Sequence, residues 1–223
     1  MSVYELQKAK PLQPEAAGQG VPPSNAPAIV LAAGASARLG APKALVRLGS
    51  RTLIEWAHHH LTVAGCRPVV LVVHPDIEGK VRDLLPEADL VVNHTFSSGR
   101  TGSLQTGLHH LNTNGHSLAR VVMAPVDRPG WNASVVRALV DGSGCVGSVH
   151  ANQRGHPVVL DETGVQTVLQ AEASAPLNAL VEFSPVEVKA PWLGLNVDTP
   201  QQVEVLEGLV DELLLYFAEG EGI

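Results

Sequence analysis

One segment near the N-terminus combines small residues with two cations in a pattern that suits anion binding. Residues 29–43 read "IVLAAGASARLGAPK", so that an apolar run ends at Gly34 and is followed by Arg38 and Lys43. Small side chains let backbone N–H groups approach an anion closely, and Arg and Lys supply positive charge for phosphate oxygens. The segment therefore predicts a phosphate-binding loop. The alternative is a small-residue turn that packs a helix against a strand.

Two better-known glycine motifs do not describe this segment. A Walker A loop places four residues between its glycines and follows Lys with Ser or Thr. Here five residues separate Gly34 from Gly40, and Ala44 follows Lys43. Residues 29–43 also lack a dinucleotide-binding fingerprint, which is G-x-G-x-x-G with an acidic residue about 20 positions further on. The loop is therefore expected to bind phosphate in a different way.

Two aspartates are candidate ligands for a divalent metal ion. Asp127 follows the strand-like run "VVMAP", and Asp198 lies in "GLNVDTP" shortly before a helical segment. Mg²⁺ is typically held by one or two carboxylates together with phosphate oxygens and water. The alternatives are a strand-end turn for Asp127 and the N-cap of the last helix for Asp198.

Short β-branched runs alternate with helical patterns from Ala28 onwards. The predicted strands are "AIVLAA", "PVVLVVH", "ADLVVN" and "ARVVMAP", and the predicted helices lie near residues 52–64, 77–85, 102–111 and 133–140. This alternation is typical of a parallel sheet with helices on both faces. We therefore expect an α/β fold, a Rossmann-like three-layer α/β/α arrangement with a mainly parallel sheet.

The pattern changes towards the C-terminus. Residues 145–161, "CVGSVHANQRGHPVVLD", contain two strand-like runs joined by a polar turn, which predicts a hairpin or a small antiparallel edge of the sheet. Pro157 in the second run requires an edge or first-residue position, because proline cannot donate to a strand ladder.

The remaining patterns predict packing. A single last helix is expected over residues 200–217, with Pro in its first turn and Thr199 or Asp198 as its cap. The runs "HHH" at 58–60 and "HH" at 109–110 are expected on solvated helix faces, because consecutive helical residues point in different directions and cannot share one metal ion. The tryptophans are expected to be packing anchors: Trp56, Trp131 and Trp192.

Composition and charge restrict the class of protein. The chain has 223 residues, a net charge of -7 and a pI near 5.8, which argues against nucleic acid as a partner. Cys66 and Cys145 form no metal-binding motif, and no stretch has the length of a membrane span. We expect free thiols, no membrane association and a cytoplasmic location. Residues 1–26 are expected to be a flexible leader and residues 27–218 a single domain.

The small-residue segment resembles the L-A-[AG]-G-x-S-x-R-M-G-x-[DP]-K signature of the MobA-like NTP transferases, with Leu39 in place of the usual Met. The resemblance implies a nucleotide-diphospho-sugar transferase-like fold and a loop that holds the triphosphate of an incoming nucleotide. It also implies catalytic roles for Arg38, Lys43 and Asp127. The implied nucleotide-binding residues of the loop are Leu31, Ala32, Ala33, Gly34, Ser36, Gly40 and Lys43.

Four further segments are similar to motifs of the same family. Its D-x-P and N-x-[DN]-T-P motifs imply Asp127 and Asp198 as ligands of Mg²⁺ or Mn²⁺, with Asn196 in place of the first acid of the cytidylyl version. Residues 93–104 match N-x(4-6)-G-x-x-x-S-L, which lines the nucleotide pocket. R-G-H-P at 154–157 is similar to a segment on the acceptor side of molybdenum cofactor cytidylyltransferases. The implied binding residues are Gly99, Gly102, Ser103, Arg154 and His156.

These features predict an enzyme that transfers NMP from an NTP to a phosphorylated acceptor such as molybdopterin, with release of pyrophosphate. "LAAG", "APK" and R-G-H-P favour CTP, with GTP as the alternative, whereas "AEASAPLNAL" replaces the G-D-x-G segment of the CTP-using branch. Other open alternatives are a nucleotidyltransferase for a sugar phosphate or another small acceptor, and a catalytically weak nucleotide-binding or cofactor-handling protein. A molybdoenzyme or a second copy of the chain would contact the last helix.

Overall fold

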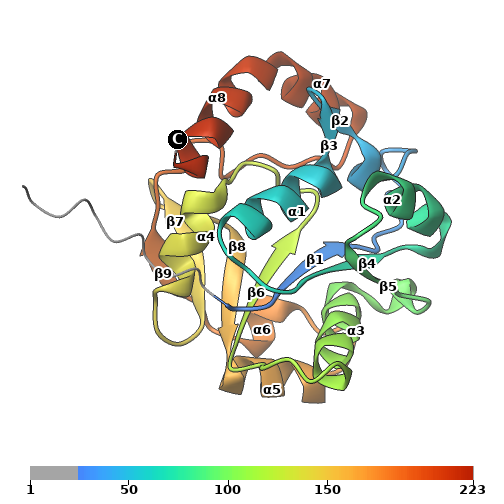
Figure 1. The fold of residues 1–223 in the computed structure, drawn as a ribbon, viewed down its shortest axis with the longest axis vertical. Coiled ribbons are helices and arrows are strands. Elements are labelled where there is room, and N and C mark those ends of the chain that lie inside the picture. The colour runs from blue at the N-terminus through green and yellow to red at the C-terminus, as the bar shows by residue number, and fades with distance from the viewer. Residues whose placement is uncertain (1–24, 223) are drawn as a thin grey trace, which may run out of the picture.

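The computed structural model describes residues 25–222 and contains a seven-stranded sheet with helices on both faces (Figure 1). The strands in spatial order are β5 (Asp89–Val92), β4 (Val69–Val73), β1 (Ala28–Ala32), β6 (Arg120–Pro125), β8 (Gln153–Asp161), β7 (Val146–His150) and β9 (Ser184–Glu187). The predicted α/β fold with a mainly parallel sheet is confirmed. Of the predicted leader, residues 1–24 lie outside the described residues.

One side of the sheet differs in detail from the prediction. β1 pairs in parallel with β4 and β6, and β4 pairs in parallel with β5, as expected. β8 then pairs antiparallel with both β6 and β7, and β9 pairs in parallel with β7 at the outer edge. The antiparallel strand therefore lies inside the sheet. The sequence of β9, "SPVE", contains a proline and has no clear strand pattern, so it was not predicted.

Pro157 lies in β8 between two neighbouring strands, so the prediction of an edge or first-residue position is wrong. Pairing of β8 with β6 begins one residue later, where Val158 lies opposite Met123. Pairing with β7 shifts its register at this point, and the carbonyl of Pro157 accepts a hydrogen bond from Ser148 Oγ at 3.1 Å. The irregular pairing means that no ladder N–H is required here, and a central strand can then accommodate proline.

The helices are α1 (Leu53–Val63), α2 (Glu78–Leu84), α3 (Arg100–Thr113), α4 (Ala133–Val140), α5 (Glu162–Gln170), α6 (Leu177–Leu180), α7 (Pro200–Gly208) and α8 (Val210–Glu221). The short turns η1 (Lys43–Leu45), η2 (Pro75–Ile77) and η3 (Phe96–Ser98) lie in loops, and a hairpin of β2 (Arg47–Leu48) and β3 (Arg51–Thr52) leads into α1. Helices α1 to α4 were predicted. Between residues 25 and 222, no helix combines the length and the apolar character needed to cross a membrane.

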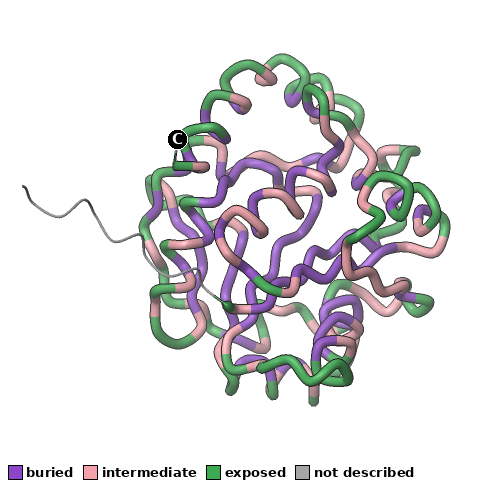
Figure 2. The backbone as a smooth tube through the Cα atoms, in the orientation of Figure 1, coloured by how far each residue is buried: buried purple, intermediate pink, exposed green. Residues whose placement is uncertain are grey.

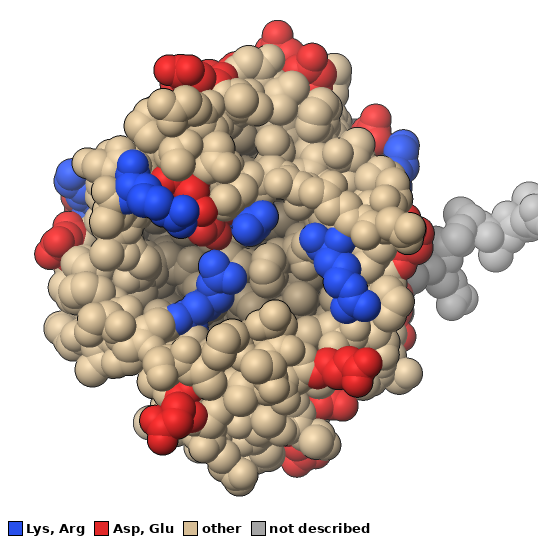
Figure 3. Space-filling view, turned by 180° about the vertical axis from the view of Figure 1, so that it is seen from behind, with Lys and Arg blue, Asp and Glu red and all other residues tan. Residues whose placement is uncertain are grey.

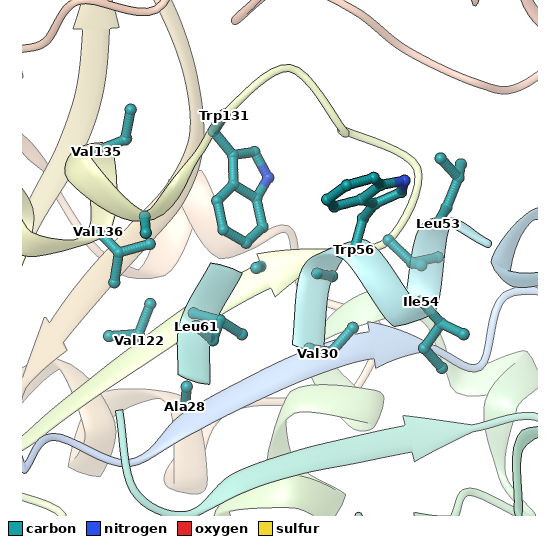
Figure 4. Packing of buried hydrophobic residues seen from close by; sticks show 14 of the residues in the cluster. Ala28, Val30, Leu53, Ile54, Trp56, Leu61, Val122, Trp131, Val135 and Val136 are labelled. Atoms are coloured by element: carbon teal, nitrogen blue, oxygen red, sulfur yellow. The ribbon is translucent and has the colours of Figure 1, made fainter. Parts of the chain in front are cut away.

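Alternation along the buried strands divides the core into two layers. Ala28, Val30 and Ala32 belong to the layer that contains α1 and α4, whereas Ile29 and Leu31 belong to the layer of α3 and α5. Figure 4 shows the first layer from close by, and Figure 2 shows that the buried backbone follows the strands through the centre. Strands buried on both faces read as continuous apolar runs, which explains why β1, β4 and β6 could be predicted.

Helix α3 lies very close to β1. A Cβ on Gly107 would be 2.8 Å from Cγ2 of Ile29, so only glycine permits this approach. The close packing sets the position of the N-terminus of α3, where Arg100 and Ser103 stand, next to the end of β1.

The predicted last helix is in fact two helices that meet at Leu209. Thr199 forms a capping box with Gln202 at the start of α7, so Thr199 and not Asp198 is the cap. Leu209 has φ -108° and ψ 11°, outside the helical region, and follows a glycine, which weakens helices. The break lets α8 pack its apolar face against α1 and α4.

One member of the histidine run is buried, so the expectation of solvated helix faces is wrong for His60. It is 2% exposed, and its ring centroid lies 4.5 Å from that of Phe217 and 5.3 Å from that of Trp56. Burial lowers the pKa of His60 to about 3, so the imidazole is neutral. Trp56 and Trp131 are buried beside it, which confirms them as packing anchors, and both cysteines are free as predicted.

Candidate active site

The candidate site lies where three parallel strands end. The carboxyl ends of β1, β4 and β6 meet at one edge of the sheet, and the segments that follow them contribute to a cavity of about 530 Å³. We call this the first cavity. Ligands of open parallel sheets bind outside this edge. On the surface shown in Figure 3, Lys and Arg side chains gather around a hollow, with acidic side chains next to them on one side.

The loop after β1 leaves part of its backbone available to a ligand. Apart from Gly34 and its two chain neighbours, no residue of 25–222 has an atom within 4 Å of the position that a Cβ of Gly34 would take. Ser36 adopts a left-handed φ of 52°, and its Oγ accepts a hydrogen bond from the N–H of Lys43 at 3.1 Å, which closes the loop. The N–H groups of Gly34 and Ala35 form no hydrogen bond within residues 25–222, so they can bind an anion.

Lys43 lies between two carboxylates. Its Nζ is 3.3 Å from Asp127 Oδ2 and makes a second, shorter contact with Asp198 Oδ1. These three side chains are between 14% and 17% exposed. The guanidinium of Arg38 contacts Asp198 Oδ2 at 3.0 Å from the solvent side. Two cations and two carboxylates from three distant segments of the chain therefore form one cluster, which we call the Lys43 cluster.

Hydrogen bonds keep Asp198 ionised. Its pKa is lowered to about 2, chiefly by the hydrogen bond from Lys43 and also by one from Asn196, whose Nδ2 donates to Asp198 Oδ2 at 2.8 Å. Because Thr199 caps α7, the carboxylate of Asp198 is not used as a helix cap. It is therefore directed to the Lys43 cluster as a negatively charged group.

The residues of the Lys43 cluster fit a divalent cation. Mg²⁺ and Mn²⁺ prefer oxygen ligands such as carboxylates and amide carbonyls, and Asp127 and Asp198 supply carboxylates. Asn196 adds a buried Oδ1 that has no hydrogen-bond partner among the described residues. Across residues 25–222, no group of three or more His, Cys, Asp or Glu side chains is arranged to hold a metal ion. A cation at the two aspartates would therefore take its other ligands from substrate phosphates and water.

A second cavity of about 600 Å³ adjoins the first at Arg100, the only described residue that lines both. Arg154 and His156 line this second cavity, and Arg154 donates to the carbonyl of Phe183 at 3.2 Å. Burial lowers the pKa of His156 to about 4, and its buried Nδ1 has no partner in the part of the chain that the structure describes. The second cavity is therefore lined by cations, a neutral imidazole and apolar side chains, of which Met123 is one.

The predicted site residues fall into four groups. Those that line the first cavity are Leu31, Ala32, Ala33, Gly34, Ser36, Lys43, Gly99, Ser103 and Asp127. Arg38 and Asp198 reach the Lys43 cluster from outside the cavity lining, and Arg154 and His156 line the second cavity. Two glycines line neither cavity. Gly40 forms the loop turn with φ 73°, and Gly102 lets α3 approach Ala173, whose Cβ would lie 3.1 Å from a Cβ on Gly102.

Several residues that line the first cavity were not predicted. They include Pro42, His74, Asp76, Ile77, Phe96 and Arg100. His74 and Asp76 follow β4, which pairs with β1, and Phe96 follows β5. The ring centroids of His74 and Phe96 lie 4.0 Å apart. The available signal was the strand pattern itself, since segments that follow neighbouring parallel strands lie at the same edge of the sheet.

Comparison with solved structures identifies the fold. The structure of Rv0371c from Mycobacterium tuberculosis H37Rv is 22% identical, covers 84% of this chain and 100% of that chain, and has a TM-score of 0.70. Rv0371c has also been solved in complex with manganese, with 21% identity, coverage of 82% and 98%, and a TM-score of 0.66. At this identity the likeness bears on the fold. This fold is that of the nucleotide-diphospho-sugar transferases, as predicted.

The sequence itself defines the family. The model of the MobA-like NTP transferase domain matches residues 28–188, and the chain belongs to this family of nucleotidyltransferases. The nicotine blue oxidoreductase of Paenarthrobacter nicotinovorans is 32% identical over 198 residues, which are 78% of this chain and 93% of that protein. The molybdenum cofactor guanylyltransferase of Sinorhizobium fredii (strain NBRC 101917 / NGR234) is 25% identical over 207 residues, with 84% and 93% covered.

Proposed function

We propose that this protein transfers a nucleoside monophosphate from an NTP, with CTP favoured over GTP, to a phosphorylated acceptor such as molybdopterin. The observation that carries the proposal is the Lys43 cluster beside a cavity at the carboxyl edge of the parallel sheet. Membership of the MobA-like family supports nucleotidyl transfer, and the relative named as a molybdenum cofactor guanylyltransferase supports the acceptor class.

The proposed reaction brings two anions together. An oxygen of the acceptor phosphate forms a bond to the α-phosphorus of the NTP, the bond from this phosphorus to the bridging oxygen breaks, and pyrophosphate leaves with the bonding electrons. Lys43, Arg38 and the N–H groups of Gly34 and Ala35 neutralise and orient the triphosphate. An acceptor phosphate is already ionised near neutral pH, so no side chain is needed as a base. The chain contributes positioning and charge.

Asp127 and Asp198 are the residues that we assign to hold Mg²⁺ or Mn²⁺. A bound divalent ion supplies positive charge where the α-phosphate and the leaving pyrophosphate carry negative charge. The unpartnered Oδ1 of Asn196 supports an electrophile at this place. The manganese complex of a protein with the same fold is consistent with such a site.

Nucleotide and acceptor occupy different cavities in this proposal. The nucleotide lies in the first cavity, whose lining includes the phosphate loop together with Gly99 and Ser103. The acceptor lies in the second cavity, with Arg154 and His156. The preference for CTP rests on the sequence segments "LAAG" and R-G-H-P, whereas the guanylyltransferase relative supports GTP as the alternative. The last helix α8, with Leu215 70% exposed, is the surface we assign to a molybdoenzyme or a second copy.

Thermal stabilisation by the four NTPs, each with and without Mg²⁺, tests this function, because a bound ligand stabilises the folded state by mass action. We expect CTP to raise the melting temperature in a Mg²⁺-dependent manner, and Asp127→Ala to abolish most of this shift. Asp83→Ala, which alters an exposed aspartate of α2, is the matched control. Pyrophosphate release with CTP and molybdopterin completes the test. No shift with any NTP would contradict nucleotidyl transfer, and a preference for GTP would contradict only the choice of nucleotide.

Redox activity is the second candidate function. Its support is the 32% identity to a relative named as an oxidoreductase, which exceeds the 25% identity to the guanylyltransferase. The sequence has a G-x-G-x-x-G match at residues 142–147, but this segment follows α4 and leads into β7, whereas a dinucleotide fingerprint follows a strand and opens a helix. Its context therefore counts against a dinucleotide site. Stabilisation by NADH or NADPH, without stabilisation by any NTP, would favour the redox candidate over nucleotidyl transfer.

A further inference from the structure

Two guanidinium groups near the junction of the two cavities have no partner in the described chain. Arg100 is the first residue of α3 and lines both cavities, and Arg128 directly follows Asp127. Neither side chain forms a hydrogen bond or an ion pair with any residue of 25–222, although Nε of Arg128 is buried. A buried guanidinium N–H normally has an acceptor, so its absence here indicates that a ligand supplies one.

The environment of His156 places both cations close to this junction. His156 lines the second cavity, and Asp127 lines the first. Arg100 and Arg128 both lie near enough to His156 to lower its pKa, and Asp127 lies near enough to raise it. Burial is the main reason that the imidazole is neutral, and its buried Nδ1 is also without a partner among the described residues. The junction therefore contains three polar groups that the described protein does not satisfy.

The other cations of the two cavities already have acceptors. Lys43 lies between Asp127 and Asp198, and Arg38 also contacts Asp198. Arg154 donates to a backbone carbonyl. No carboxylate lines the second cavity in the described part of the chain, so nothing in that lining compensates the positive charge of Arg100. Arg128 lines neither cavity, but its buried Nε has no acceptor among the described residues, which is costly, and a bound anion would offset this cost.

We propose that Arg100 and Arg128 bind the phosphate of the acceptor and present its oxygen to the α-phosphorus. This inference rests on the proposed nucleotidyl transfer, because it takes the first cavity as the nucleotide site. The acceptor phosphate and the NTP repel each other, and two fixed guanidinium groups where they meet reduce this repulsion and orient the attacking oxygen. The described residues thus supply the charge that the reaction needs at this point.

The lining of the second cavity also restricts the body of the acceptor. Met123, Val158, Leu177 and Phe183 contribute apolar surface behind the two cations. The polar side chains of Thr101, Ser148, Ser174 and Asn178 also line this cavity. The ligand class that fits is therefore a phosphate monoester whose body has an apolar face.

Phenyl phosphate, which has this chemistry, is the probe for the test. The full-length protein is first saturated with Mg²⁺ and α,β-methylene-CTP, a CTP analogue whose nucleotidyl group cannot be transferred, and phenyl phosphate binding is then measured by calorimetry. The variants are Arg100→Met and Arg128→Met, since Met keeps an apolar stem and removes the charge. Arg82→Met is the control, because Arg82 lies on α2 and pairs with Glu78 at the surface.

We expect Arg100→Met and Arg128→Met each to weaken phenyl phosphate binding by at least about tenfold, and to weaken binding of the CTP analogue by a smaller factor. The control should change neither affinity. Arg100 is exposed at the N-terminus of α3, so Arg100→Met tests the proposal even if Arg128→Met lowers the melting temperature.

The outcomes separate this proposal from the one on which it rests. If the wild type binds the CTP analogue but not phenyl phosphate, or if both Arg variants bind phenyl phosphate as the wild type does, the Arg100 and Arg128 assignment is wrong and nucleotidyl transfer stands. If the wild type binds neither the CTP analogue nor the matching GTP analogue, nucleotidyl transfer fails. Phenyl phosphate binding that depends on both arginines would then still support an anion site at the junction.

Discussion

Lys43 serves the site by its charge and contributes little to packing. Its ammonium is held by two carboxylates, and its backbone N–H closes the loop through Ser36. We predict that Lys43→Ala weakens triphosphate binding by at least about tenfold and changes the melting temperature by only a few degrees, because no core contact is lost. Calorimetry and thermal unfolding measure the two effects. Lys80→Ala, at an exposed position of α2, is the control, and a collapse of the fold would show that Lys43 is a structural residue.

His60 makes the protein sensitive to acid. In the folded state its pKa is about 3, against an ordinary value of 6.5, so the unfolded chain takes up a proton that the folded chain excludes. Stability must therefore fall as the pH drops below about 6.5, until the pH approaches the folded-state pKa. We predict that the free energy of unfolding of His60→Leu exceeds that of the wild type in this range. The difference should grow by about 1.4 kcal/mol for each unit by which the pH falls.

Urea unfolding at several pH values between 6.5 and 4 measures this margin. Because His58 and His156 are unchanged in the variant, their contributions cancel in the difference. A margin that does not vary with pH would show that His60 is protonated in the folded protein.

At the residue scale, motif recognition found the charged groups of the Lys43 cluster and missed Asp76, Arg100 and several uncharged residues that line the first cavity. Lys43 stands in a long, specific motif and Asp127 at the end of a predicted strand, so both could be expected near the phosphate loop. His74 and Phe96 have no motif of their own, and only the pairing of β4 with β1 and with β5 brings them to the first cavity. His60 was misjudged because the helix pattern does not show that α8 covers this face of α1.

Helix α8 is joined to α4 by a buried asparagine. Asn132 is 1% exposed, its Oδ1 accepts hydrogen bonds from the N–H groups of Ser134 and Val135 at the start of α4, and its Nδ2 donates to the carbonyl of Tyr216 at 2.8 Å. Asn132→Ala removes the cap and leaves the Tyr216 carbonyl unsatisfied. We predict a loss of about 2 to 3 kcal/mol in the free energy of unfolding.

Chemical denaturation measures this loss, and Asn112→Ala, at an exposed position of α3, is the control that should be nearly neutral. Equal stability of the two variants would mean that α8 is held by apolar packing alone.

At the element scale, the strands that read as continuous apolar runs and helices α1 to α4 were predicted correctly, whereas α5, α6 and β9 were not. β1, β4 and β6 are buried on both faces and read as continuous apolar runs. β9 and α6 have four residues each, and their sequences contain too few turns or alternations to show a period. The division between α7 and α8 depends on packing against the core, which a helical pattern cannot indicate.

At the scale of the whole molecule, the order of the elements located the site. Parallel strands in alternation with helices predict that the loops after them share one edge, and the first cavity lies there. The second cavity could not be predicted, because α3, β7, β8 and the segment after α5 reach it from separate parts of the chain. Only the insertion of β8 between β6 and β7 brings them together.

If Asp127 and Asp198 hold a metal ion as proposed, the position of Lys43 limits when that ion can bind. Its ammonium already acts as the counter-ion of Asp127 and Asp198, so a metal ion that arrives alone must compete with a tethered charge. A nucleotide triphosphate offers the ammonium other anionic partners and thereby frees both carboxylates. The protein would then acquire its metal together with the nucleotide, and would be shielded between turnovers from unsuitable divalent ions.

This order of binding can be measured with Mn²⁺ as a paramagnetic probe in the absence of nucleotide. We predict that Lys43→Met binds Mn²⁺ at least about tenfold more tightly than the wild type, even though it binds triphosphate less well. Equal Mn²⁺ affinity of the two proteins would mean that the lysine is no barrier to metal. If the prediction holds, the protein without nucleotide stays free of metal when the concentration of free metal changes. It then binds the metal ion only when nucleotide is present.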